Sequence, residues 1–402
     1  MSSFSRRRLL QLSAAAGAAA LGAASCSARP ATDQAAGAAR LSSPTGVLGA
    51  NFNGDPSIMS WAGLERAEAT WVRGFAAMPD LDEGTPADNR AIKTLLDAVD
   101  RKYGVVLSLK FPYFPRSHDR IPRPGTEEMK KDLARVDKVL PEVMGEVDVL
   151  VIGNEPFIEC PKADWTNGAI NDFYETVAEH VIDYRAKNFP DGCKTVLYMG
   201  SLNHLDQPDE WINSGTDRWM KYVRDTPEIE GTDIHPHVDE PNGAQAYLDY
   251  VLPKLGDKKF LVTEFSLVQL WKNHLTDKIP AAYAEKYGVP AGTEVWQVIR
   301  NALKQPFPKQ RWYDLLRESP WFEDNKHYLS EQMAKFRATG KLAVATYGIG
   351  QDAAMSGDDF DAKSTPWLLN SLYASATVQS EPNGEAAPNY AWLEDFTRAQ
   401  KS

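Results

Sequence analysis

The sequence predicts an α/β domain in which a buried strand followed by a helix recurs along most of the chain. Short runs of branched apolar residues alternate with amphipathic segments between residues 46 and 377, as parallel strands joined by crossover helices require. Two of these runs, 149–152 and 260–263, lead into glutamates. About 75 residues separate the last two predicted strands, far more than a single crossover helix needs.

Eight strands are expected where short apolar runs are bounded by glycine or polar residues. They cover residues 46–52, 69–75, 104–110, 149–153, 194–200, 231–237, 260–264 and 341–347. Helices are expected at 88–103, 126–144, 171–188, 211–224, 245–255, 327–339 and 367–377. In the first helix Ile92, Leu95 and Val99 share one face, and Gly104 ends it. This regular alternation predicts a (β/α)8 TIM barrel over residues 45–402.

The long connection before the last strand contains an excess of aromatic residues. Residues 266–320 include Trp271, Trp296 and Trp312. We interpret this segment as a cap inserted over the mouth of the barrel, between its seventh and eighth strands. Most of its aromatic side chains are expected to fill a core, and some to line a groove. The tail from Glu381 is expected to pack on the outside.

The first residues form an export signal rather than a part of the barrel. Arg6, Arg7 and Arg8 precede an alanine-rich apolar run, which is typical of a twin-arginine leader and is too short for a comfortable membrane span. We place this signal at residues 1–28, and a flexible tether at 29–44. Cys26 follows a sequence similar to a lipobox, so lipid attachment there and cleavage near Ala28 both remain open. The alternative is a basic disordered tail.

Charge and cysteine content narrow the classes of partner. The chain has 402 residues and a formal net charge of −11, so it lacks the basic face that nucleic-acid binding needs. Beyond Cys26, the remaining cysteines are Cys160 and Cys193. The predicted topology places them at opposite ends of the barrel, beyond the reach of a disulfide. Both are therefore expected to be free thiols.

The two glutamates that follow buried strands are the candidates for chemistry. Asn154, Glu155 and Pro156 end the fourth strand, and Glu264 ends the seventh. Poor strand formers at these points place both carboxylates where strands stop and loops begin. With Arg73 near the end of the second strand, the pattern resembles the large clan of retaining glycoside hydrolases built on TIM barrels. The resemblance covers the barrel and excludes the leader.

This resemblance implies a role for each matched residue. Glu155 would be the acid and then the base, Asn154 would bind the 2-hydroxyl of the sugar, and Glu264 would be the nucleophile. Retention requires the two carboxyl groups to lie about 5–5.5 Å apart. Arg73 is expected to keep Glu264 ionised, while a drier loop keeps Glu155 protonated. The alternative makes Glu155 a helix-capping acid and Glu264 a surface residue. No cofactor or metal is required.

Histidines at the end of the sixth strand allow two interpretations. His235 and His237 flank a proline, and a His-x-His pair beside a carboxylate can ligate a metal. The resembling clan instead places a residue here that bonds the nucleophile or the sugar. We prefer that role, with alternation turning only one of the two rings inward. Asn203, at the end of the fifth strand, is assigned to substrate binding, and His204 either lines the site or is a plain loop residue.

The chain also departs from the pattern of the clan. Many members place a tryptophan at the end of the eighth strand, where this chain has Tyr347. We expect Tyr347, or Trp271 from the cap, to stack against the sugar. The tyrosine that commonly contacts the nucleophile from the sixth strand is absent. Lys110, at the end of the third strand, either binds the carboxylate of an acidic sugar or is simply solvated.

These observations together predict an exported retaining glycoside hydrolase that cleaves an oligo- or polysaccharide. It would be periplasmic, anchored to the cell surface by lipid, or extracellular. Two alternatives remain open. One is a carbohydrate-binding lipoprotein that uses the same barrel without catalysis. The other is a metal-dependent hydrolase that uses His235 and His237.

Overall fold

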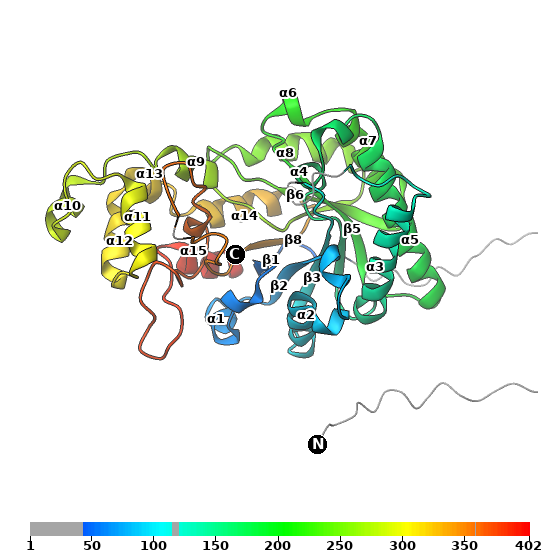
Figure 1. The fold of residues 1–402 in the computed structure, drawn as a ribbon, viewed down its shortest axis with the longest axis horizontal. Coiled ribbons are helices and arrows are strands. Elements are labelled where there is room, and N and C mark those ends of the chain that lie inside the picture. The colour runs from blue at the N-terminus through cyan, green and yellow to red at the C-terminus, as the bar shows by residue number, and fades with distance from the viewer. Residues whose placement is uncertain (1–42, 115–119, 358) are drawn as a thin grey trace, which may run out of the picture. The chain divides into compact units, whose positions relative to one another are not determined.

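A computed structural model describes residues 43–114, 120–357 and 359–402 of the chain. The expected leader, with Cys26, and nearly all of the tether lie outside the described residues. Eight strands form one closed barrel in chain order, and every pairing is parallel (Figure 1). They are β1 (Val47–Asn53), β2 (Trp71–Ala77), β3 (Gly104–Lys110), β4 (Val149–Ile152), β5 (Val196–Asn203), β6 (Ile229–His235), β7 (Lys259–Val262) and β8 (Leu342–Gly348). The predicted (β/α)8 barrel is confirmed.

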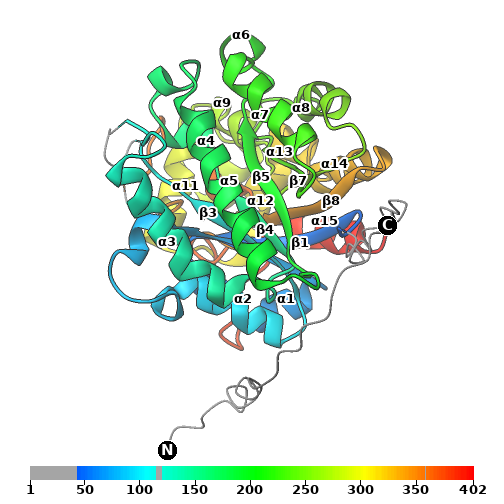
Figure 2. The ribbon, with the colours of Figure 1, turned by 90° about the vertical axis from the view of Figure 1, so that its right-hand side faces the viewer.

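Helices connect successive strands on the outside of the barrel, as Figure 2 shows for α3, α5 and α7. The α-helices of the crossovers are α1 (Trp61–Arg66), α2 (Arg90–Asp100), α3 (Glu127–Val143), α4 (Pro156–Glu159), α5 (Ala169–Asn188), α6 (Pro208–Trp211), α7 (Ser214–Asp225), α8 (Ala244–Val251) and α14 (Tyr328–Ala338). Single 3-10 turns are η1 (Pro56–Ile58), η2 (Met78–Leu81), η3 (Pro86–Asp88), η4 (Lys162–Asp164), η5 (Leu252–Lys254) and η6 (Trp367–Leu369). The expected helices before β8 therefore form, and most of their ends lie within a few residues of the predicted bounds.

Helix α2 illustrates how local sequence sets these elements. The Asn89 side chain accepts a hydrogen bond from the Ile92 N–H at 3.1 Å and so caps the first turn. Ile92, Leu95 and Ala98 then point to the barrel and are buried. The expected helix at 211–224 is instead divided, because Asn213 caps a new helix, α7, by accepting the N–H of Gly215 at 2.9 Å.

Side chains that alternate along the strands form two apolar clusters. The smaller cluster contains residues from β3, β4, β5, β7 and β8, including Val106, Val151 and Tyr198. Their neighbours along the same strands, such as Leu107 and Leu150, belong to the larger cluster that packs under the helices. This period of two is what a barrel with a filled interior requires. The polar residues of the site therefore sit above a packed floor.

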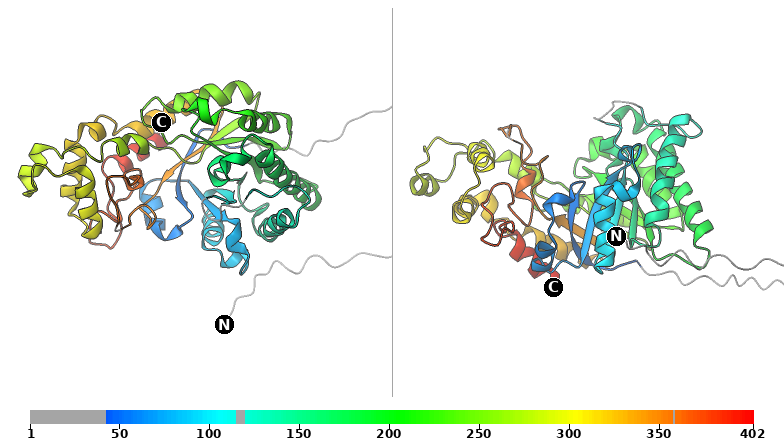
Figure 3. Two further views of the ribbon diagram at one scale, coloured as in Figure 1. Left: turned by 45° about the horizontal axis from the view of Figure 1, so that its top comes forward. Right: turned by 60° about the horizontal axis from the view of Figure 1, so that its bottom comes forward.

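Between β7 and α14, the helix that leads into β8, the chain contains five helices. They are α9 (Val268–Asn273), α10 (Ala281–Tyr287), α11 (Val295–Lys304), α12 (Lys309–Glu318) and α13 (Pro320–Glu323). Figures 1 and 3 place this segment beside the C-terminal part of the chain. Two tryptophans make the contact: Trp271 donates to Asn370 and Trp312 donates to Asn389, both at 2.9 Å. The insertion is present, but its function as a cap over the mouth is not confirmed.

The helix expected at 367–377 is wrong. Only η6 forms there, and the chain then runs beside the end of β8. The N–H of Leu372 bonds to the Gly348 carbonyl at 2.9 Å, and the N–H of Tyr373 bonds to Ile349 at 3.0 Å. These long-range partners replace the helical ones, which local propensity cannot reveal. Helix α15 (Trp392–Gln400) packs on α14 and completes the outer layer.

The expectation of free thiols agrees with the structure. Cys160 is buried, Cys193 is half-buried, and neither forms a disulfide. Burial, together with the charge of Asp164, raises the pKa of the Cys160 thiol to about 12, so this thiol remains protonated and unreactive. Within the described ranges, no helix is both long enough and apolar enough to cross a membrane.

Candidate active site

The two predicted glutamates meet at the carboxyl ends of the strands. Glu155 follows β4 as the residue before α4, and Glu264 lies two residues beyond β7. One carboxylate oxygen of each lies within 4.8 Å of the other, and a ring nitrogen from each of His235 and His237 lies within the same distance. The side chains of Glu155 and Glu264 are 20% and 14% exposed. A substrate can therefore reach both carboxylates from outside.

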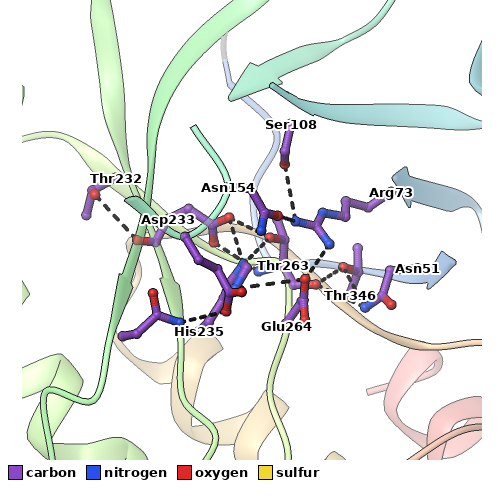
Figure 4. Close-up of polar contacts among 12 residues, drawn as sticks. Asn51, Arg73, Ser108, Asn154, Thr232, Asp233, His235, Thr263, Glu264 and Thr346 are labelled. Atoms are coloured by element: carbon purple, nitrogen blue, oxygen red, sulfur yellow. Dashed lines mark hydrogen bonds and ion pairs between the residues drawn. The ribbon is translucent and has the colours of Figure 1, made fainter. Parts of the chain in front are cut away.

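Arg73, on β2, bonds Glu264 and organises one half of the site (Figure 4). It is fully buried on β2, and its Nη1 donates to Glu264 Oε1 at 2.6 Å and to Asn53 Oδ1 at 2.7 Å. Its Nη2 donates to Asn154 Oδ1 at 2.6 Å and to Ser108 at 3.3 Å. One guanidinium thus fixes the carboxylate that follows β7 and the amide that follows β4.

His235 lies beneath Glu155 and organises the other half. Its Nδ1 is 3.2 Å from Glu155 Oε1, and its Nε2 is 2.8 Å from Thr263 Oγ1 and 3.3 Å from Asp233 Oδ2. Thr263 in turn donates to Asp233 Oδ2 at 2.5 Å. Figure 4 shows Asp233, Thr263 and His235 grouped in this way. The buried Asp233 orients the imidazole, so that a ring N–H points at Glu155.

These contacts determine how the cluster holds protons. Burial opposes protonation of His235, but the negative charges of Glu264 and Asp233 raise its pKa to about 10. Burial alone would raise the pKa of Glu155, yet the hydrogen bond from His235 outweighs it and lowers that pKa to about 2. Burial of Glu264 is likewise outweighed by His235 and Arg73, which hold its pKa well below the usual range. The expectation that Glu155 stays protonated in a drier loop is therefore wrong, because His235 holds the proton.

Asn154 is oriented from both sides. Its carbonyl oxygen accepts from Arg73, and its Nδ2 donates to Glu159 Oε1 at 2.8 Å. Glu159 is buried at the end of α4, and Lys110 Nζ lies 3.0 Å from the same Oε1. Glu159 was not identified from the sequence. Its position one helical turn after Glu155 was the available signal, since residues four apart share a helix face.

A cavity of about 610 Å³ opens above the carboxylates. Asn53, Phe75 and Lys110 line it from the ends of β1, β2 and β3. The loop after β8 contributes residues 352–355, and η6 contributes Trp367, whose ring meets His237 edge-on at 4.7 Å. Asp352 and Trp367 were not predicted, because their loops follow no regular pattern. No residue of the 266–320 insertion lines this cavity.

The remaining predicted residues divide into two groups. Asn203 donates to Glu155 Oε1 at 2.8 Å, and His237 Nε2 lies 3.6 Å from Glu264 Oε2 while its Nδ1 bonds Ser266 at 2.8 Å. Both belong to the cluster. Trp271 and Tyr347 have no exposed surface. They pack in the core rather than at the cavity, so the expectation that either stacks on a sugar is wrong.

His204 does not line the 610 Å³ cavity. Its ring packs on Trp211 at 4.4 Å. The residue therefore has a packing role in this structure. Burial lowers its pKa, which keeps the ring neutral beside Trp211.

The same four residues could in principle hold a metal ion, since Glu155, His235, His237 and Glu264 cluster closely. The donor chemistry does not favour it. The pKa of His235 is raised to about 10, so a metal would have to displace a strongly held proton to bind this ring. Glu264 Oε1 is already bonded to the Arg73 cation, whose charge opposes a second cation there. The geometry fits charge-paired carboxylates better than metal ligands.

No protein-family model matches the chain, and no curated protein matches it. Among solved structures, the endo-beta1,6-glucanase BT3312 matches with a TM-score of 0.50 and 9% identity, over 90% of this chain and 77% of that one. The Thermobacillus composti GH10 xylanase has a TM-score of 0.48 and 15% identity, over 88% and 96%. The family 30 subfamily 8 xylanase Xyn30A from Clostridium acetobutylicum has 0.46 and 12%, over 89% and 72%. The likeness to the glucanase agrees with the barrel fold, and no particular family is identified.

Replacing His235 should make stability depend less steeply on pH. A histidine whose pKa rises from 6.5 to about 10 on folding stabilises fully below pH 6.5, and this contribution is lost as pH rises toward 10. The unfolding free energy of the wild type minus that of His235→Asn should therefore shrink between pH 6.5 and 10. Urea unfolding across this range measures it, with His180→Asn on α5 as the control. A constant difference would contradict a protonated His235.

Proposed function

We propose that this protein is an exported retaining glycoside hydrolase, which cleaves an oligo- or polysaccharide by double displacement. The observation that carries the proposal is the approach of Glu155 and Glu264 from opposite strands of the barrel to within 4.8 Å. Carboxyl groups about 5–5.5 Å apart suit attack by one on the anomeric carbon, whereas inverting enzymes need about 6.5–9.5 Å to fit a water between them. The spacing therefore favours a covalent intermediate.

Glu264 is the nucleophile in this proposal. Arg73 and His235 keep its carboxylate ionised, and an ionised carboxylate is the form that attacks. Asn154, held by Arg73 and Glu159, would position the 2-hydroxyl of the sugar. Trp367 offers an aromatic ring in the cavity, where the apolar face of a sugar could pack. Trp367 would thereby take the place that we first assigned to Tyr347 or Trp271.

Glu155 is the acid and then the base, with His235 as its proton store. In the free site the proton lies on His235, whose pKa is raised largely by the charge of Glu264. As Glu264 attacks the anomeric carbon, the bond from that carbon to the leaving oxygen breaks and the carboxylate becomes a neutral ester, which removes its charge. His235 becomes more acidic as this charge is lost, and its proton can pass across 3.2 Å to Glu155 and on to the departing oxygen. In the second step Glu155 takes a proton from the water that cleaves the ester, and this proton returns to His235 as the Glu264 carboxylate is restored.

The shape of the site supports an extended substrate. A second hollow, of about 320 Å³, adjoins the main cavity, because Gly54 and Phe75 line both. The two volumes together offer room for more than one sugar unit beside the carboxylates.

Export is proposed from the leader at residues 1–28. Mass spectrometry of the mature N-terminus should find diacylglycerol on Cys26 or a start near Ala28; an intact Met1 on the exported protein would contradict both.

A 2-fluoro glycoside with an activated leaving group should label Glu264 covalently, because the fluorine slows hydrolysis of the intermediate more than its formation. Peptide mass spectrometry identifies the labelled residue. A non-catalytic carbohydrate-binding protein would show no label with any sugar, although it would still bind saccharides in calorimetry.

Variants of the two glutamates provide the matched control for this trapping. Glu155→Ala should still form the intermediate from substrates with good leaving groups, since these need no proton. Glu264→Ala should lose turnover on every substrate. Equal losses in both variants on an activated substrate would contradict these roles.

The metal-dependent alternative predicts a different response to chelation. The clustering of His235 and His237 with both glutamates is the observation that favours it. We expect the protein to keep its activity after dialysis against EDTA, with well under one equivalent of metal by elemental analysis. Loss of activity that added Zn²⁺ restores would favour the metal hydrolase instead.

A further inference from the structure

The charged residues that line the main cavity are mostly acidic. Asp55, Glu155, Glu264 and Asp352 contribute four carboxylates, and Lys110 is the one lysine or arginine in the lining. Charge in the lining affects which substrates bind, because a charged sugar loses its hydration when it enters the cavity. This desolvation costs free energy unless charges of opposite sign in the lining compensate it. The balance of these groups therefore decides which sugars fit.

Three of these charges are already compensated by buried partners. Arg73 lies beneath Glu264 at 2.6 Å, and His235 lies beneath Glu155 at 3.2 Å. Lys110 is compensated as well, since Glu159 Oε1 lies 3.0 Å from its Nζ and the Glu159 side chain is only 4% exposed. The charge of Lys110 is thus neutralised from below, while its ammonium sits over the Phe75 ring at 4.5 Å.

The other two carboxylates keep most of their negative charge. Asp352 accepts the Met355 N–H at 2.9 Å, and no salt bridge to it is found within the described ranges. Asp55 accepts the Ser57 N–H at 2.9 Å. Its salt-bridge partner is Arg90 at 3.9 Å, and both side chains are exposed to water, where such pairs contribute little. Burial, with the charges of Asp55 and Glu264, raises the pKa of Asp352. The wall formed by Asp55 and Asp352 is therefore electronegative.

We propose that Glu159 sets the substrate class of this cavity: by neutralising Lys110 it leaves a net negative lining, which accepts an uncharged sugar and excludes a uronate. This inference rests on the proposed glycosidase function. A uronate carboxylate placed here would face Asp55 and Asp352 with no uncompensated cation to pair with. The acidic-sugar role considered for Lys110 is thereby replaced by a structural one.

Glu159 acts through other residues rather than by touching substrate. It is held one turn after Glu155, with its N–H bonded to the Glu155 carbonyl at 2.8 Å. Its Oε1 serves both Lys110 and Asn154, while its Oε2 has no hydrogen-bond partner. A glutamine at this position keeps the shape and one acceptor oxygen but cannot cancel the charge of Lys110. Glu159→Gln therefore separates the charge of the residue from its packing.

The test compares kcat/KM for matched neutral and uronide substrates, namely 4-nitrophenyl glucoside with glucuronide and galactoside with galacturonide. We expect the wild type to prefer the neutral member of a pair. Glu159→Gln should shift the uronide-to-neutral ratio upward by about tenfold, because it frees one cation near the sugar. Asp352→Asn should shift the ratio in the same direction. Glu127→Gln, on the exposed face of α3, makes the same charge change far from the cavity and should leave the ratio unchanged.

Two results would overturn the inference: a wild type that prefers the uronide, or a Glu159→Gln variant that loses activity equally on both substrates. The second result would mean that Glu159 only positions Asn154. Absence of hydrolysis for all substrates would count against the proposed function. In that case calorimetry measures the affinities for the free uronate and neutral oligosaccharides, and their ratio replaces the ratio of kcat/KM values. No binding, or a ratio that Glu159→Gln leaves unchanged, overturns the inference.

Discussion

The site depends on one buried cation. Arg73 has no exposed surface, yet its guanidinium bonds Glu264, Asn53, Asn154 and Ser108. It links Asn53 at the end of β1 and Ser108 inside β3 to Asn154 and Glu264, which follow β4 and β7, so the geometry of the mouth is set by one planar group. Removing one partner from such a pair typically costs about 3–5 kcal/mol, a large part of the net stability of a domain. The packed interior of the barrel below Arg73 holds the buried guanidinium and its partners in place.

Two further charges at the mouth are likewise matched by a neighbour of opposite sign. His235 serves Glu155 and Glu159 serves Lys110, in the way that Arg73 serves Glu264. Pairing of this kind keeps these six ionisable groups in a small volume without leaving any of the six uncompensated. It also couples them, because a change of charge on Glu264 is felt by His235 at 3.9 Å and then by Glu155. A catalytic cycle that consumes and restores one charge can use such coupling to move a proton.

Some of this arrangement could be predicted from the sequence, and the reason differs by residue. Glu155 and Glu264 follow short apolar strands, and the parallel topology brings such strand ends to one rim. Arg73 was expected near the end of its strand but lies inside β2 (Trp71–Ala77), from which its long side chain still reaches Glu264. The roles of Trp271 and Tyr347 were wrong because residue type does not say which way an aromatic ring points; both rings found core partners. Asp352, Trp367 and Glu159 were missed because long-range contacts place the first two and a short helical turn places the third.

Residues on strands and residues on loops differ in how well their positions can be predicted from the sequence. In the proposed function, the groups that would form and break bonds, Glu155 and Glu264, follow strands, and their positions are set by the closed sheet. Asp352 and Trp367, which line the cavity and would contact the rest of a sugar, stand on the irregular chain after β8. Loops vary more freely than the strands they join. The sequence pattern of the strands can therefore predict the type of reaction. The identity of the substrate depends on charged and aromatic side chains that only the tertiary structure brings together.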